Sequence, residues 1–227
     1  MVLGYVLALI LSAVDFFTEG FFSKASPNKM KFISFSAGVS ISYIFLVLLP
    51  EIYSSAIAIN RLLFFSVLFG FGLFHIIEKY IRQNFTGPEM RKEHRLVHST
   101  TSFVYFFVVG FILVKLVERD VVDGIFLFIP ITLHIVIDSL PRRHTKKHYI
   151  RVLSAASPFF GALVATFIDI GGVGNVILLG LIGGALLYTV IRESLPRDRE
   201  GRPLYFIIGL LFFTVVILLL WDIVAIS

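Results

Sequence analysis

The chain has 227 residues, of which 57% are hydrophobic and only 15% are charged, and it contains 25 phenylalanines. A water-soluble domain lacks the polar surface to cover so much apolar side chain, so this composition excludes one and is typical of a helical membrane protein. The net charge of +5 does not indicate a nucleic-acid partner, because the basic residues cluster between apolar runs, and the absence of cysteine excludes disulfides and thiolate metal sites.

Eight mostly apolar runs have the length that crosses a hydrocarbon core of about 30 Å. The first begins at once, with no basic segment or cleavage site before it, so we interpret it as a retained span rather than a signal peptide. We therefore predict an all-α polytopic protein, a bundle of eight transmembrane helices that forms a single domain over residues 1–227. In chain order the predicted spans cover 2–22, 32–53, 61–82, 98–118, 124–140, 152–170, 174–194 and 204–225.

The basic residues support this count because they fall in alternate loops. Of the 20 lysines and arginines, only Arg61, Lys115 and Arg119 lie on the other side. The positive-inside rule then places both termini outside the cytoplasm. We expect a multi-pass protein of the plasma membrane whose longest loop, 83–97, is a flexible or partly helical cytoplasmic link.

His134 and Asp138 stand four residues apart inside the fifth apolar run. Positions i and i+4 share one helix face, so the imidazole and the carboxylate point the same way at membrane depth. Ionisable groups are costly there, which makes the pair a candidate functional site. Two interpretations stay open: the pair binds a metal ion, or the two side chains only hydrogen-bond each other or neighbouring helices.

Other ionisable side chains also gather toward the predicted cytoplasmic ends of the spans. Imidazole and carboxylate ligands suit zinc, iron, manganese and nickel. Glu78 has Arg82 four residues on, which favours a local ion pair, and His98 is equally explained as an interfacial histidine. The remaining members of this group are Asp15, Glu19, His75 and Glu193.

Small residues recur in the second, sixth and seventh runs. Gly180 and Gly184 have the GxxxG spacing that lets helix backbones approach closely, and we interpret them as packing residues. The chain has no Walker loop, no HExxH, no GxSxG and no glycine-rich dinucleotide turn. We therefore expect that the protein is not an enzyme and carries no cofactor.

The order of these motifs resembles the ZIP (ZRT/IRT-like) family of divalent metal transporters, which have eight spans and both termini outside. The segment FSAGVSISYIFLVLLPEI (35–52) is similar to the family's second span, with its small-residue start and Leu-Leu-Pro-Glu finish. GFGLFHIIEKYI (70–81) is similar to its glycine-rich third span, and Ser154–Ala162 and Gly184–Pro196 are similar to the start of its sixth span and to its seventh. The resemblance covers nearly the whole chain in short pieces.

The family builds its metal site from a His-Asn/Ser-x-x-Asp/Glu-Gly motif in span 4 and a His-Glu-x-x-His motif in span 5. In span 4, His98 and Ser99 match while Ser102 replaces the carboxylate; in span 5, His134 matches while Ile135 and Asp138 replace the glutamate and the second histidine. The resemblance thus implies one surviving metal site made of His98, Ser102, His134 and Asp138. The second metal of a two-metal site is lost.

These observations lead to three hypotheses. The first is an alternating-access carrier of a divalent transition metal, zinc by default, which is the substrate. The second is a ZIP-like protein that binds metal or regulates without transporting. The third is an intramembrane zinc hydrolase that uses His75, His98, His134 and Asp138 around a metal-bound water. We expect the metal ion and the lipid bilayer as partners, no nucleic acid, and retain a homodimer as a candidate assembly.

Overall fold

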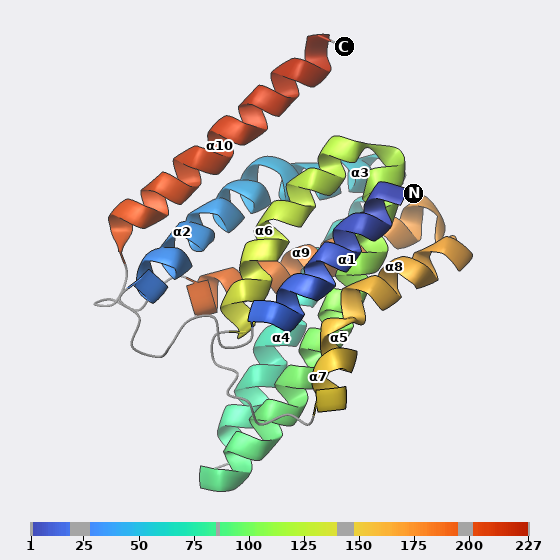
Figure 1. Ribbon diagram of the computed structural model, residues 1–227. Coiled ribbons are helices and arrows are strands. Elements are labelled where there is room, and N and C mark those ends of the chain that lie inside the picture. The colour runs from blue at the N-terminus through green and yellow to red at the C-terminus, as the bar shows by residue number, and fades with distance from the viewer. Residues whose placement is uncertain (1, 19–27, 85–86, 140–147, 195–201, 227) are drawn as a thin grey trace.

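The computed structural model describes residues 2–18, 28–84, 87–139, 148–194 and 202–226, and every element in these ranges is a helix. Figure 1 shows them as a bundle of inclined helices. The elements are α1 (Val2–Thr18), α2 (Asn28–Tyr43), η1 (Ile44–Leu48), α3 (Leu49–Ile59), η2 (Arg61–Phe64), α4 (Phe65–Asn84), α5 (Gly87–Arg119), α6 (Val121–Ser139), α7 (His148–Ala155), α8 (Ser157–Phe167), α9 (Gly171–Thr189), η3 (Val190–Ser194) and α10 (Pro203–Ile226).

Four of these helical segments are long and apolar enough to cross a membrane: Asn28–Ile59, Thr100–Arg119, Gly171–Arg192 and Pro203–Asp222. Four further apolar helices are shorter: Val2–Thr18, Arg61–Ile77, Val121–Ile137 and Ser157–Phe167. The all-helical fold and these apolar helices are those of an integral membrane protein. Each of the eight predicted runs coincides with one of these eight segments.

Two boundaries differ from the sequence-based expectation. The predicted link 83–97 is largely helical, because α5 begins at Gly87 and runs for 33 residues. Its first half is rich in good helix formers, and Pro88 occupies a first-turn position that tolerates proline. The predicted sixth span is two helices that meet at Ala156, since Pro158 has no N–H to donate and its ring would crowd the carbonyl of Ser154.

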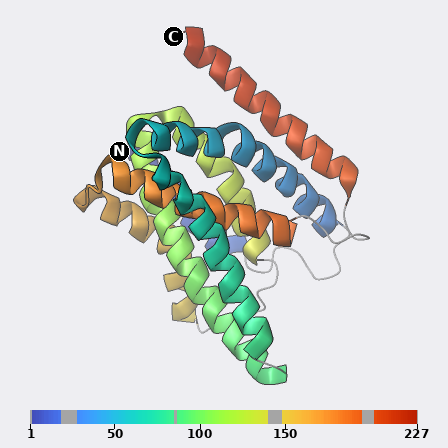
Figure 2. The same ribbon diagram turned by 180° about the vertical axis from the view of Figure 1, so that it is seen from behind.

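Three helix pairs pack through glycines: α2 with α10, α4 with α9, and α5 with α8. A Cβ on Gly38 would lie 2.2 Å from the carbonyl oxygen of Phe206, and one on Gly161 would lie 1.8 Å from that of Phe107. These distances require glycine, because no real Cβ approaches a backbone atom so closely. Gly180 and Gly184 likewise face α4, which confirms them as packing residues. In Figure 2 the first two helix pairs are seen from behind.

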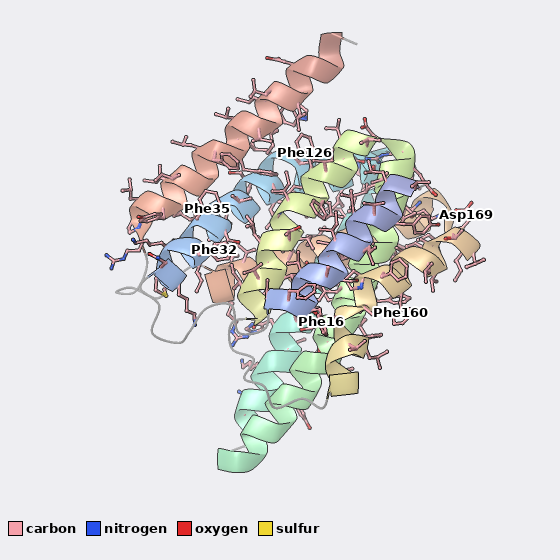
Figure 3. The ribbon with its side chains drawn as sticks, in the orientation of Figure 1. Phe16, Phe32, Phe35, Phe126, Phe160 and Asp169 are labelled. Atoms are coloured by element: carbon pink, nitrogen blue, oxygen red, sulfur yellow. The ribbon has the colours of Figure 1, made fainter. Side chains whose placement is uncertain are left out.

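Helix α1 packs against α5, α6 and α8, and α10 lies on the outside of the bundle against α2. Phenylalanine rings join the outer helix to the interior. Phe35 of α2 lies tilted at 5.9 Å from Phe212, and Phe126 of α6 meets the fully buried Phe213 edge-on at 6.4 Å. Figure 3 shows Phe35 between α2 and α10 and Phe126 beside the upper half of α6.

The helix of the second run widens into a π turn at Ile44–Leu48, two residues before Pro50. Pro50 cannot donate to the carbonyl four residues earlier and its ring would crowd that carbonyl, so the wider turn accommodates it. Pro130 lies inside α6, one turn before His134, and removes another backbone hydrogen bond. Both irregular turns therefore lie in helices that enter the core.

The helices alternate in direction between two ends of the bundle. The end of α1 and the beginnings of α2 and α10 lie at one end, which we call the basic end because Lys29 and Lys31 lie in the first turn of α2 and Arg202 directly precedes α10. The first residues of α1, the turn between α5 and α6, and the last residues of α10 lie toward the opposite end in Figure 1. We call this the acidic end.

Candidate functional site

His134 is buried where α6 meets α5. Its side chain is 4% exposed, and its ring lies 6.0 Å from that of Tyr105 and 6.2 Å from that of Phe106. Tyr105 in turn packs edge-on against Phe74 of α4 at 5.9 Å. An imidazole is a common metal ligand in proteins, and this one is held in place by aromatic rings.

The sequence places His134 there because α6 buries a helical stripe. Leu127, Ile131 and Ile135 are fully buried on this helix, and His134 lies on the same side. Asp138 follows one turn later on α6, and its side chain lies outside the described part of the structure.

Helices α5 and α6 run antiparallel from a short turn at Asp120, so residues at equal distance from the turn share one level. The contact between Tyr105 and His134 fits this rule, since they are separated from the turn by similar numbers of residues. Ser102 and Asp138 are likewise equidistant from it. At a rise of about 1.5 Å per residue, His98 belongs about 6 Å farther from the turn, roughly one helical turn toward the basic end.

The four expected ligands therefore belong to two facing helices, but only two of their side chains are described. His134 is buried and Ser102 is half-buried. The side chains of His98 and Asp138 lie outside the described residues, although their backbones are helical. Among the side chains that are described, no three histidines or acids come together to hold a metal.

Asp15 is a buried carboxylate that the sequence singled out without assigning it to the site. It is 5% exposed on α1, the helix that packs against α5, α6 and α8. One turn earlier, Ser12 accepts a 3.2 Å hydrogen bond from the backbone N–H of Phe159. Buried charges in proteins are paired or bind metal ions, so Asp15 joins the candidate residues of the interior. Glu19, four residues later in the sequence, lies outside the described residues.

The other ionisable residues of the sequence prediction lie elsewhere or are not described. His75 is exposed on α4, and its ring meets that of Tyr188 on α9 at 5.8 Å. The side chains of Glu78 and Glu193 lie outside the described residues. His75 and His134 thus have different surroundings.

An ion triad that the sequence did not predict joins three helices at the acidic end. The guanidinium of Arg119, at the end of α5, lies 2.6 Å from the carboxylate of Glu51 on α3 and 2.5 Å from that of Asp123 on α6. Arg119 and Asp123 are four residues apart across a helix junction, but nothing in the sequence places Glu51 beside them. The triad therefore connects α3, which belongs to the second apolar run, to both α5 and α6.

No known family model matches this chain, and no curated protein does so either. The residues of the site are therefore the basis for its proposed function.

Proposed function

We propose that the chain is a membrane transporter for a divalent transition metal, with zinc as the default substrate. In this proposal eight helices span the membrane with both termini outside the cytoplasm, as in the ZIP-like architecture that the motifs resemble. The metal would pass a single site between α5 and α6. The observation that carries the proposal is His134, a buried imidazole that contacts α5 at the level next to Ser102 and Asp138.

The chemistry of these side chains suits reversible binding. The His134 imidazole and the Asp138 carboxylate would be the main ligands, with His98 from the basic end and the Ser102 hydroxyl as further contacts. Ligands must lose protons to bind a metal, so protonation releases it and uptake should fall at acidic pH. One imidazole and one carboxylate from one helix would leave coordination positions on the metal ion open. Water or the carboxylate of Asp15 could occupy them.

A transporter of this kind must open to each side in turn. At the acidic end, the triad of Glu51, Arg119 and Asp123 ties α3 to α5 and α6. In the proposed cycle these ion pairs separate when that end opens and form again when it closes. The glycine contacts between α2 and α10 and between α4 and α9 provide smooth surfaces along which helices slide.

The deciding experiment measures zinc uptake by the full chain in sealed proteoliposomes. We expect His134→Ala and Asp138→Ala each to abolish uptake, because each removes a main ligand. Asp222→Ala is the control, since it removes an exposed carboxylate of α10 and should leave uptake unchanged. Undiminished uptake by a correctly folded Asp138→Ala protein would contradict the site.

The second candidate is a metal-binding or regulatory membrane protein that does not transport. Its support is the small ligand set, since Ser102 and Asp138 stand where the resembled motifs carry a carboxylate and a histidine. Zinc binding to the detergent-solubilised chain with no uptake into proteoliposomes would favour it. The hydrolase hypothesis has less support, because it needs His75 and His134 around one metal and their surroundings differ.

A further inference from the structure

A pocket of about 460 Å³ lies between α4 and the last turns of the α9–η3 helix. Four of its lining residues come from successive turns of α4, and three come from α9 and η3. These seven are Phe71, His75, Lys79, Gln83, Tyr188, Ile191 and Arg192. The proposed transport site uses none of them.

Tyr188 lines this pocket, and three other side chains lie around its ring. Phe71 and His75 meet its ring edge-on at 5.5 and 5.8 Å, and the guanidinium carbon of Arg192 lies 6.0 Å from the ring centre. An aromatic ring attracts a guanidinium beside it and restricts its orientation. The pocket therefore combines aromatic rings with basic side chains.

Two basic side chains line the pocket from opposite helices. These are Lys79 and Arg192, Gln83 adds an amide donor, and none of the described lining residues is acidic. The pocket also lies toward the basic end, where α4 and η3 finish. Paired cations with an amide donor match a phosphate group, which arginine binds through two parallel hydrogen bonds.

An exposed apolar stripe on α4 runs from the pocket toward the middle of the helix. Phe69, Leu73, Ile76 and Tyr80 recur at helical spacing and are 63%, 41%, 65% and 59% exposed. Eleven residues of helix cover about 16 Å, which is close to half of a hydrocarbon core of about 30 Å. The stripe therefore has the length of one leaflet's acyl chains and begins where a headgroup would lie.

We propose that this pocket binds the headgroup phosphate of an anionic phospholipid of the leaflet at the basic end. Lys79 and Arg192 hold the phosphate, Gln83 donates a further hydrogen bond, and Tyr188 supports the guanidinium. The acyl chains lie along the apolar stripe of α4. The site requires that α4 and α9 lie in the bilayer, but it does not require metal transport.

The test is lipid binding to the purified, delipidated full chain in neutral detergent, measured by native mass spectrometry. The probes are phosphatidylglycerol, phosphatidylcholine with the same acyl chains, and inorganic phosphate. We expect phosphatidylglycerol to bind at least about tenfold more tightly than either alternative, because two charge-assisted contacts are involved. The Lys79→Gln/Arg192→Gln variant should lose this preference, and Lys79→Arg/Arg192→Lys should retain much of it.

The matched control is Lys29→Gln/Arg202→Gln, which removes two positive charges from the beginnings of α2 and α10 at the same end of the bundle. It should keep the wild-type preference, and circular dichroism should show both double variants equally helical. Equal losses in both variants would mean general attraction to the basic surface and would overturn the site. Equal affinity for phosphatidylcholine, or for inorganic phosphate, would overturn the assignment to an anionic lipid.

Discussion

Burial separates the acidic, basic and histidine side chains that the structure describes into two groups. His134 and Asp15 are 4% and 5% exposed inside the bundle. Others, such as Arg119, Lys79 and Asp169, lie at the ends of helices, where water or headgroups solvate them. Only the first group carries the full cost of leaving water, and that cost is the physical reason for giving it a role in binding.

At the residue scale the ion triad allows a stability prediction. Replacing Arg119 with methionine leaves Glu51 and Asp123 facing each other without the cation between them. All three side chains are partly exposed, at 49%, 29% and 29%, so water screens their interactions. We expect Arg119→Met to lower the stability of the chain in detergent by about 1 kcal/mol.

The control for the triad is Arg61→Met, because Arg61 is exposed at the same end of the bundle. Thermal unfolding should shift for Arg119→Met and not for Arg61→Met, and added salt should reduce the difference. Equal unfolding of wild type and Arg119→Met at low salt would show that the triad contributes nothing.

The sequence indicates which residues are costly, but not which helices bring them together. Spacing alone put His134 and Asp138 on one face of a helix, and the burial of His134 agrees with that choice. It could not show that α1 packs against α6, so Asp15 remained outside the predicted site. Nor could it pair Arg119 with Glu51, because that contact joins residues 68 apart in the chain.

At the element scale, apolar length and loop charge predict where helices lie, because both depend on local composition. Their irregularities were not predicted. The π turn before Pro50 and the break before Pro158 depend on how one ring meets one carbonyl. The helical stretch 87–99 was predicted only in part, since its charged residues are typical both of an exposed helix and of a loop.

At the element scale, we predict that alanine substitutions at two glycines of α4 change the stability of the protein in opposite directions. A Cβ on Gly70 would lie 2.3 Å from the backbone oxygen of Leu181, whereas one on Gly72 would meet nothing within 4 Å. Gly70→Ala therefore forces α4 and α9 apart and should cost about 1–3 kcal/mol. Gly72→Ala gains helix propensity and should stabilise by up to about 1 kcal/mol.

Thermal unfolding of the two variants in the same detergent measures this difference, and each is the control for the other. We expect this difference because helices in a membrane have no hydrophobic driving force between them, so their association depends on close backbone contact. A Gly70→Ala protein as stable as Gly72→Ala would mean that α4 and α9 do not pack as closely as the structure has them.

At the scale of the whole molecule, the number of spans is the property on which the proposed function depends. In the described part of the structure four helices are long and apolar enough to span a membrane, whereas the apolar runs of the sequence and the alternating loop charge predict eight spans. The number of spans is eight if the shorter helices α1, α4, α6 and α8 also cross the membrane, and four if they do not. They pack inside or between the longer ones, and α1 contacts α5, α6, α7 and α8, so protein neighbours replace part of their contact with lipid.

The helix α4 provides the test, because Arg61 lies just before it in η2, Gln83 lies in its last turn, and both are exposed. If α4 spans the membrane, these two positions lie on opposite sides; if only the four longest helices span, they lie on the same side.

The natural chain has no cysteine, so Arg61→Cys and Gln83→Cys each introduce a single thiol. In intact cells we expect a membrane-impermeant maleimide to label Arg61→Cys at once and Gln83→Cys only after permeabilisation. Asp169→Cys, in the turn between α8 and α9, should behave like Arg61→Cys. Labelling of Arg61→Cys and Gln83→Cys from one side would rule out eight spans, and with them the orientation that the transport proposal requires.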